Sequence, residues 1–245
     1  MFYYCNNFNS LVTISEGVSK VSNMFYYANK FNQPINVPSS VNMEGMFYVA
    51  PVFNSPVNIA EGVENMSRAF YMCNNFNQLI TIPNSVTDMG YTFYNCIKLN
   101  QPITIPDSVV NMYSTFSGCN NLNQPITISN GVTNLSYTFN ACSRFNQPII
   151  IPESAIDLHN TFRNCTNMGS NITILSRNVN VVTGMLNNKN NSKRVNIICP
   201  AGSTTNTRLA YTNTQSVARY SISWTLDSAN NCRYNATRNI YVYWV

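Results

Sequence analysis

The sequence predicts an α/β solenoid, in which nine coils of about 23 residues stack with a parallel β-sheet on one face and a mostly-β cap follows. Three observations lead to this prediction. An aromatic anchor recurs at a nearly constant spacing, paired aliphatic residues follow each anchor with a period of two, and apolar residues at spacings of three and four surround it.

The anchor repeat is the strongest of these observations. Subtracting successive anchor numbers gives 23, 22, 23, 23, 23, 23 and 23, and Met185 takes the next place at the same interval. Such regularity indicates stacked structural units. The aromatic anchors are Phe2, Phe25, Phe47, Phe70, Phe93, Phe116, Phe139 and Phe162.

The strand of each unit lies ten to twelve residues past its anchor. In the segment 122–128, Ile126 and Ile128 alternate with Thr127, so the isoleucines should point inward and the threonine outward. The ninth unit keeps this aliphatic pair as Val195 and Ile197. At the spacing of neighbouring strands, nine coils give a rod on the order of 40 Å long.

The second half of each unit predicts a short helix or helical turn. Val132, Leu135, Phe139, Cys142 and Phe145 occur at spacings of three and four, which places them on one apolar stripe. An Asn or Asp precedes the stripe and can cap its first amides. These capping residues are Asn42, Asn65, Asp88, Asn111, Asn134 and Asp157.

The segment LNQPITIPDSVVNMYSTFSGC at residues 99–119 resembles the BspA-like class of leucine-rich repeats, and the related repeat of mycoplasma and Gram-positive surface proteins. The resemblance spans roughly residues 1–200. It implies a leucine-rich-repeat solenoid, extended and slightly curved, that serves adhesion and recognition and carries no catalytic residues. The sequence departs from the family where Thr precedes the anchor, as at Thr92, Thr115 and Thr138, in place of Ala.

Two regions follow from this pattern. Residues 1–199 form the solenoid and residues 200–245 a C-terminal capping module, because the period stops there. The cap contains Tyr220, Ile222 and Trp224 and ends in the apolar run 239–245, which we expect to be a buried or interface strand. Residues 199–203, with Tyr211 and Trp224 beyond, look like the usual way in which such arrays close.

The first coil has no cap, because Phe2 is already an anchor. An open solenoid end exposes apolar side chains and unpaired backbone. We therefore expect this coil to pack on an upstream domain or on another chain, for example a second copy in a homo-oligomer.

The cysteines share one repeat position, three residues past the anchor. Consecutive cysteines are within disulfide reach on distance alone, but Ala28 and Ala50 occupy the same slot, so buried free thiols are favoured. Cys199 and Cys232 lie off this position and could pair with each other. No Cys-x-x-Cys pair occurs and His159 is the sole histidine, so neither metal nor cofactor is expected. The aligned cysteines are Cys73, Cys96, Cys119, Cys142 and Cys165, after Cys5.

An asparagine recurs seven residues past the anchor. It could form a ligand row, but bonding to the backbone of adjacent coils is the favoured interpretation. The row includes Asn54, Asn77, Asn100, Asn123 and Asn146.

Two surface columns are candidate binding faces. Tyr26, Tyr48, Tyr71 and Tyr94 follow the anchors, and tyrosine gives a large contact area at small entropic cost. The alternative is that they stack across coils and only stiffen the rod. Thr81, Thr104 and Thr127 form a flat polar face on the strands.

Composition narrows the function. Charged residues make up 9% of the chain against a usual share of about a quarter, and no basic cluster suits nucleic acid. One histidine and nine scattered acids leave no catalytic arrangement, so no enzyme is expected. No stretch is long and apolar enough to insert into a membrane.

The expected function is a non-enzymatic binding or structural module that recognises a cell-surface glycan or protein. Residues 1–7 lack the features of a secretory signal, which favours a phage virion fibre on the virion surface. The alternatives are an extracellular bacterial adhesin fragment and an intracellular protein-interaction scaffold.

Overall fold

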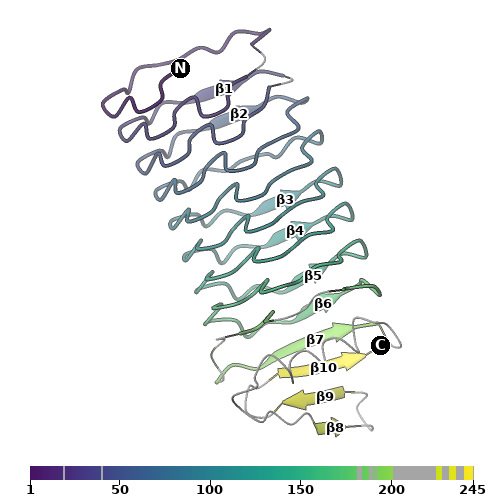
Figure 1. Cartoon of the computed structure of the whole chain (residues 1–245). Helices are drawn as coiled ribbons and strands as arrows, with labels where there is room; N and C mark the ends of the chain where they lie inside the picture. The colour runs from purple at the N-terminus through teal and green to yellow at the C-terminus, as the bar shows by residue number, and fades with distance from the viewer. Residues whose placement is uncertain are drawn as a thin grey trace.

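The computed structural model describes residues 1–18, 20–39, 41–180, 184–187, 190, 192–200, 225–227, 232–235 and 240–244. The chain winds into a solenoid whose coils stack in sequence order from the N-terminal end (Figure 1). Seven strands lie along one face, and each of β1, β3, β4 and β5 buries its first and third residues and exposes the second. The strands are β1 Ile35–Val37, β2 Val57–Ile59, β3 Ile103–Ile105, β4 Ile126–Ile128, β5 Ile149–Ile151, β6 Ile172–Ile174 and β7 Val195–Cys199.

The seven strands mark about seven turns of a β-solenoid with parallel sheets. In the first and fourth predicted units, the segments 12–14 and 80–82 form no strand, although Ile80 and Ile82 are buried like their counterparts. The pairs β1–β2, β3–β4 and β5–β6 keep the register of the repeat, as Ile103 beside Ile126 illustrates.

The ninth unit departs from the predicted register. The anchors still pair, since the Phe162 N–H donates to the Met185 carbonyl at 2.9 Å. On the strand face, however, Ile172 lies beside Ile197 and not beside Val195. Ile197 is twelve residues past Met185, whereas Ile172 is ten past Phe162, so the ninth unit contains two more residues before its aligned strand position. Ile197 therefore occupies the place predicted for Val195.

The predicted helix is wrong, and no residue that the structure describes is helical. Two residues around each anchor from Phe25 to Phe162 have left-handed backbone, as Arg68 (φ 56°) and Met72 (φ 57°) do around Phe70, and an α-helix does not accommodate them. The Tyr71 N–H donates to the Arg68 carbonyl three residues back at 3.1 Å, whereas the Met72 N–H donates to Tyr94 of the next coil at 2.7 Å. The spacing of three and four thus arises from successive turns, and the part of the chain that the structure describes is a β-solenoid and not the predicted α/β one.

The predicted caps act on these turns. The Asp88 Oδ1 accepts the Gly90 N–H at 2.8 Å, and Asn65 and Asn134 accept the N–H two residues on in the same way. This is the side-chain turn that Asn and Asp favour.

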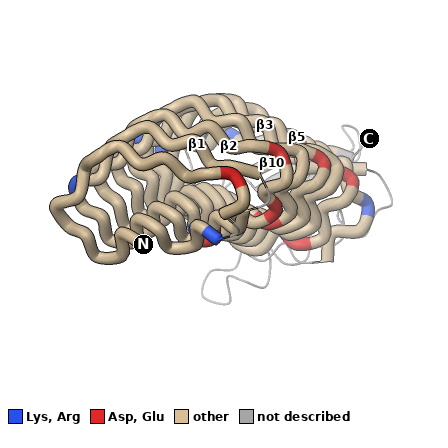
Figure 2. Tube along the Cα trace, turned by 90° about the horizontal axis from the view of Figure 1, so that it is seen from above, with Lys and Arg blue, Asp and Glu red and all other residues tan. Residues whose placement is uncertain are grey.

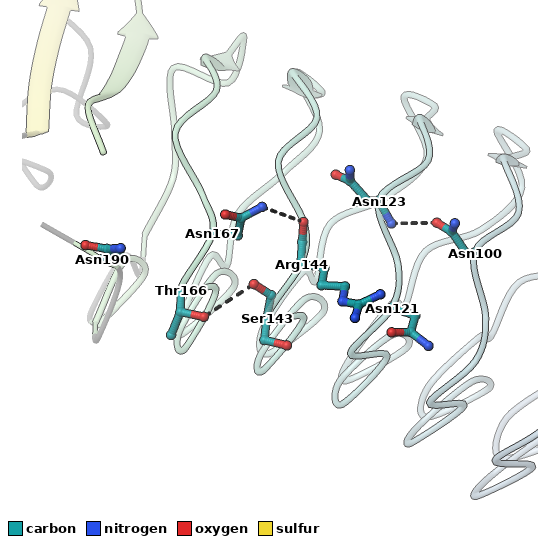
Figure 3. Close-up of a pocket in the computed structure, with 8 residues that line it drawn as sticks. All are labelled: Asn100, Asn121, Asn123, Ser143, Arg144, Thr166, Asn167 and Asn190. Atoms are coloured by element: carbon teal, nitrogen blue, oxygen red, sulfur yellow. Dashed lines mark hydrogen bonds between the residues drawn. The ribbon is translucent and has the colours of Figure 1, made fainter. Parts of the chain in front are cut away.

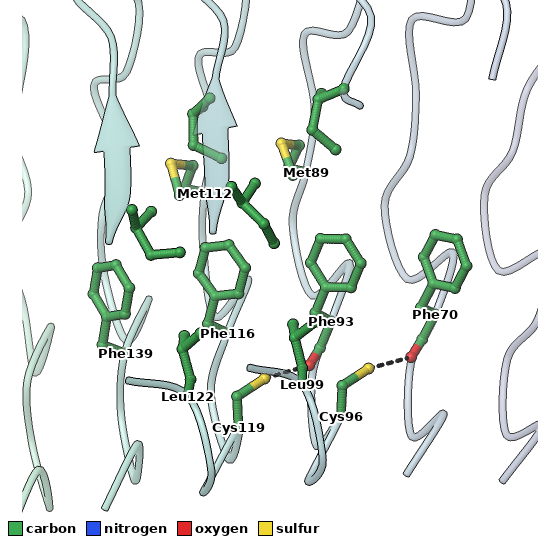
Figure 4. Packing of buried hydrophobic residues seen from close by; sticks show 14 of the residues in the cluster. Phe70, Met89, Phe93, Cys96, Leu99, Met112, Phe116, Cys119, Leu122 and Phe139 are labelled. Carbon is green, nitrogen blue, oxygen red and sulfur yellow. Dashed lines mark hydrogen bonds between the residues drawn. The ribbon is translucent and has the colours of Figure 1, made fainter. Parts of the chain in front are cut away.

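The core lies between the strands and the turns. Anchor phenylalanines stack ring on ring, with centroids 5.4 Å apart for Phe70 and Phe93 and 5.6 Å for Phe93 and Phe116, and all three are fully buried (Figure 4). The buried Thr92 hydroxyl shares its one proton between the carbonyls of Met66 and Met89, at 2.9 and 2.8 Å, so the threonine before the anchor has hydrogen-bond partners.

The solenoid sheet continues into the C-terminal region. The strand order is β5-β6-β7-β10-β9-β8, where β8 is Thr225–Asp227, β9 Cys232–Asn235 and β10 Ile240–Trp244. The final apolar run therefore forms an inner strand, as predicted, with Ile240 and Val242 buried. Tyr211, Tyr220, Ile222 and Trp224 lie outside the described residues. No helix that the structure describes could cross a membrane.

Candidate functional site

The predicted tyrosine column lies on the turn face of the solenoid. Its rings stack in parallel, with centroids 4.6 Å apart for Tyr3–Tyr26, 4.7 Å for Tyr26–Tyr48, 4.5 Å for Tyr48–Tyr71 and 4.7 Å for Tyr71–Tyr94. Tyr3 is exposed and the others are half-buried. Each ring covers the face of its neighbour, so the column presents ring edges and hydroxyls outward.

The column continues beyond Tyr94, which the sequence analysis missed. The ring centroid of Tyr91 lies 5.8 Å from that of Tyr94 and 6.3 Å from that of Tyr71. The row then continues from Tyr91 to Tyr113, Tyr137 and His159, with successive centroid distances of 5.1, 5.7 and 5.1 Å. We call the whole row the aromatic track. It comprises Tyr3, Tyr26, Tyr48, Tyr71, Tyr94, Tyr91, Tyr113, Tyr137 and His159.

The continuation was missed because it changes repeat position. The first tyrosines lie one residue after the anchor, whereas Tyr91 and Tyr137 lie two residues before it and Tyr113 and His159 three residues before it. Tyr91 and Tyr137 lie in the left-handed turn before the anchor, with φ of 59° and 57°, and this turn is on the same face of the solenoid as the first tyrosines. The recurrence of aromatic residues two or three positions before the anchors could have indicated this continuation.

The two halves of the aromatic track differ in ring geometry. From Tyr91 onward the interplanar angles are 62°, 56° and 74°, so the rings do not cover each other's faces. A small polar pocket of about 230 Å³ lies between Tyr91 and Tyr113. The Arg68 guanidinium lies 5.3 Å from the Tyr91 ring centre and 3.4 Å from Glu44, at an exposed position where such a pair contributes little stability.

Two phenols of the track, those of Tyr71 and Tyr113, are held in the neutral form. Burial, together with the neighbouring Tyr48 and Tyr94, raises the pKa of Tyr71 to about 12. Burial also raises the pKa of Tyr113 above its usual range, with a further contribution from Tyr91. The hydroxyls can therefore donate as well as accept hydrogen bonds.

The asparagine row is engaged with the backbone. Each side-chain oxygen accepts the N–H of the equivalent residue one coil on, as Asn100 does from Asn123 at 2.9 Å and Asn123 from Asn146 at 2.9 Å. The same bond joins Asn54 to Asn77 and Asn77 to Asn100, both at 2.8 Å. Four glutamines one position later add bonds to this row, as Gln101 does to the Asn77 carbonyl at 3.1 Å.

The aligned cysteines are free and fully buried from Cys73 to Cys165. Each thiol donates to the carbonyl of the anchor in the preceding coil, as Cys119 does to Phe93 at 3.0 Å and Cys96 to Phe70 at 3.1 Å (Figure 4). Burial raises the pKa of the Cys73, Cys96, Cys119, Cys142 and Cys165 thiols well above the usual range. Cys199 is also free. Among the described residues no His, Cys, Asp or Glu cluster could hold a metal ion.

The threonine column lies on the strand face. Thr81, Thr104 and Thr127 are exposed, and Thr104 lies beside Thr127 in the sheet. Ile150, 57% exposed, occupies the next place and interrupts the polar face before Thr173.

A polar groove of about 620 Å³ lies where the turns lead into the strands (Figure 3). It was not predicted, because its residues come from four to seven positions past five different anchors. Its lining comprises Asn100, Asn121, Asn123, Ser143, Arg144, Thr166, Asn167 and Asn190.

Charges are sparse along the coils (Figure 2). The acids Glu16, Glu61, Asp107 and Glu153 all lie fourteen residues past an anchor, after the strand position. The bases Lys30, Lys98 and Arg144 lie five residues past an anchor, before the strand position. The polar groove is therefore on the basic edge of the sheet.

One comparison with known proteins gave a match. A family model described as "Mycoplasma protein of unknown function, DUF285" matches residues 1–82, 64–175 and 106–199, which together include every aromatic anchor. No curated protein and no solved structure matches the chain.

Proposed function

Since the chain belongs to the DUF285 family of Mycoplasma proteins, we propose that it is a non-enzymatic recognition module whose aromatic track docks on a protein at a cell surface. The observation that carries this proposal is the track itself, an aromatic row from Tyr3 to His159 along one face. We also propose that the coils are of the BspA-like leucine-rich-repeat type and number nine. The bond from the Phe70 N–H to Thr92 at 2.9 Å joins the strandless fourth coil to the next one.

The ring geometry favours a protein partner. A sugar stacks on an open ring face, but from Tyr3 to Tyr94 each face is covered by the next ring. Ring edges and hydroxyls on a rigid backbone are typical of protein-binding surfaces, where tyrosine gives contact area at low entropic cost. A glycan bound by the track is an alternative outcome of the test below.

The chemistry of the only histidine supports a non-enzymatic role. Its Nε2 lies 3.2 Å from the Tyr137 hydroxyl and 2.8 Å from the Asn160 amide nitrogen, so neighbouring groups already engage it. The carboxylates of Asp88 and Asp157, which precede the anchor turns, accept hydrogen bonds from backbone N–H groups. In the described residues these groups form no nucleophile and base pair.

The family description, which names Mycoplasma, favours an extracellular bacterial surface adhesin as the carrier of this module. The second candidate carrier is a phage virion fibre, favoured by the charge-poor surface, with 9% charged residues. Labelling of intact cells and purified virions with an antibody against the chain distinguishes the two. An antigen found only inside cells contradicts both and favours an intracellular scaffold.

A four-residue variant tests the proposed docking face. In Tyr26→Ala, Tyr48→Ala, Tyr71→Ala and Tyr94→Ala combined, we expect at least a tenfold loss of binding to surface proteins of the target cell. A tenfold change corresponds to about 1.4 kcal/mol of binding free energy, and a single interface tyrosine often contributes that much. The measurement is binding of the labelled chain to cells, before and after surface proteolysis.

The control is the strand face, in Thr81→Ala, Thr104→Ala and Thr127→Ala combined, which should bind as the unaltered chain does. The corresponding Tyr→Phe variant keeps the stacking, and thermal unfolding of the alanine variant itself shows whether it keeps the fold. Binding unchanged by the four alanines, or lost in the threonine variant alone, contradicts the proposal. Binding to cells that survives proteolysis, or a glycan-array signal that the four alanines abolish, identifies a glycan bound by the aromatic track instead.

We further propose that another chain or an upstream domain covers the first coil. Phe2, Phe8, Val12 and Ile14 pack on the core but are only partly buried, unlike their counterparts in later coils. Light scattering of the full chain, and of a Phe8→Asp variant, tests for self-association through this surface. A monomer that binds no other chain through this coil contradicts it.

A further inference from the structure

The orientation of the asparagine amides determines what the polar groove offers to a ligand. A backbone N–H can bond to an amide only through the oxygen, so the Asn100 and Asn123 Oδ1 atoms are committed to the next coil. Their Nδ2 groups remain and are hydrogen-bond donors. Neither Nδ2 has a partner within the part of the chain that the structure describes.

Two further donors of the groove have no partner there. The Arg144 guanidinium makes no hydrogen bond or ion pair with any described residue, and neither does the Asn121 side chain. Figure 3 shows the Arg144 side chain extending from its coil toward Asn121. The guanidinium carries five N–H donors and no acceptor.

The charge of the groove has one sign. No Asp or Glu lines it. The Lys193 ammonium donates to the Asn167 Oδ1 and adds a second positive charge at the wall. The Ser143 and Thr166 hydroxyls donate to the carbonyls of Asn120 and Ser143 and can still accept a bond.

The size and shape of the groove suit an extended saccharide. It spans five coils, and its volume of about 620 Å³ lies within the usual range of ligand sites, roughly 300–1,000 Å³. Its lining is amide, hydroxyl and guanidinium, which match hydroxyls and carboxylates and offer little to an apolar ligand. Donors repeat at the strand spacing of about 4.8 Å, which is comparable with the length of one pyranose unit.

We propose that the polar groove binds an anionic saccharide, with Arg144 paired to a carboxylate or sulfate of the sugar and the amide groups of Asn100, Asn121 and Asn123 donating to its oxygens. Arginine pairs with such groups through two parallel bonds, which fix the geometry of the ligand. The groove shares no residue with the aromatic track, so this site goes beyond the docking function proposed above.

The experiment measures the affinity of the full chain for labelled oligosaccharides by fluorescence anisotropy. The probes are a polygalacturonate oligomer, its neutral methyl ester and a heparin oligosaccharide of the same length. We expect binding to an acidic probe and none to the ester. Arg144→Gln and Asn121→Asp should each weaken binding at least tenfold, because a bond to a charged group contributes about 1.5–3 kcal/mol. The acidic probe that binds more tightly identifies carboxylate or sulfate as the recognised group.

Arg163→Gln is the matched control. It removes the same charge from an exposed arginine one residue after an anchor, outside the groove, and should change the affinity less than twofold. Equal loss in Arg144→Gln and Arg163→Gln would indicate non-specific charge attraction and overturn the proposal. Equal binding of the ester, or no binding of either acidic probe, also overturns it.

The proposal for the polar groove and the proposal for the aromatic track can be tested independently. The four-tyrosine variant should bind the acidic oligosaccharide as tightly as the unaltered chain does. Arg144→Gln should in turn leave docking on surface proteins unchanged. Thermal unfolding of each variant confirms that Arg144→Gln and Asn121→Asp, both changes at unpartnered side chains, keep the fold.

Discussion

Single polar side chains form hydrogen bonds to the backbone of the neighbouring coil. The Cys119 thiol, the Thr115 hydroxyl and the Asn123 amide oxygen each bond to the backbone of a neighbouring coil, at 3.0, 2.8 and 2.9 Å. Buried polar atoms without a partner are costly. In the part of the chain described, Ser108 Oγ is the one such side-chain atom. Polar residues thus specify the alignment of coils that the apolar residues hold together.

The protonation of buried groups predicts how stability depends on pH. Burial raises the pKa of the Cys119 thiol above its ordinary 9.0 and that of Tyr71 from 10.0 to about 12. The folded chain therefore holds protons that the unfolded chain releases, so stability is fully present below pH 9 and falls as pH rises from there through about 12. Urea unfolding midpoints measured across this range should decline.

A cysteine variant isolates the thiol contribution. Cys119→Ala should fold, because Ala28 and Ala50 fill the same slot in other coils. Its unfolding midpoint should fall less steeply above pH 9 than that of the unaltered chain, since one titrating thiol is gone. A slope identical in both chains would contradict a role for the Cys119 thiol.

At the scale of one element, the turn around each anchor is the part that sequence periodicity described wrongly. Spacings of three and four fit a helix and also fit successive three-residue turns, so the apolar pattern alone could not separate them. The distinguishing residues are those at positive φ, and they include Val49 and Ala141 as well as Asn95 and Gly118. Only Asn and Gly are typical of that backbone, so a coil such as that of Phe70, with Arg68 and Met72 at these positions, gives no local signal. The strands, in contrast, were predictable because alternation has no competing explanation.

The left-handed turn predicts a stabilising substitution. Val49 has φ 54°, which a β-branched residue adopts only under strain, while Asn95 and Asn164 occupy the same turn position with φ 55° and 60°. Val49→Asn should raise the free energy of unfolding by about 1 kcal/mol. Urea unfolding measures the change.

Val110→Asn is the control, since Val110 is 47% exposed and is not among the residues with positive φ. It should not raise the free energy of unfolding. If Val49→Asn also fails to raise it, or destabilises the chain, the turn does not store the strain that its backbone indicates.

At the scale of the whole molecule, the sheet is extended beyond the repeats by β10 and β9. β7 would otherwise end the solenoid with an unpaired edge, which is a template for association with other chains. β10 covers it over five paired residues, from Ile240 beside Val195 to Trp244 beside Cys199. The apolar run predicted this strand, but sequence could not show its partner, because the pairing joins segments about 45 residues apart.

The aromatic track and the polar groove exist only at this scale. The track changes repeat position between Tyr94 and Tyr91, and the groove needs Arg144 and Asn121 from adjacent coils. Columns at one repeat position could be read from the sequence, as the tyrosine, cysteine and asparagine columns were. Surfaces that combine positions depend on where the turns point, and that was the element predicted wrongly.

Disrupting the end strand should cause association. Val242 is buried within β10, and Val242→Asp places a charge there, so β10 should leave β7 and expose its edge. Size-exclusion chromatography with light scattering should show dimers or larger species at concentrations where the unaltered chain has its smaller mass.

The same change at an exposed position, Val110→Asp, is the control and should not alter the mass. An unaltered mass for Val242→Asp as well would show that β10 is not what protects the edge of β7.

The bonds between coils connect equivalent residues one unit apart, as those of Asn77, Asn100 and Asn123 do. If a whole unit is inserted or deleted, each interrupted bond is replaced by an identical one, and even the shorter step from Phe25 to Phe47 is accommodated. Unequal crossing-over within the gene therefore yields folded proteins of different length at little energetic cost. Natural isolates should accordingly differ by whole units in the middle of the array, while both ends of the rod stay constant.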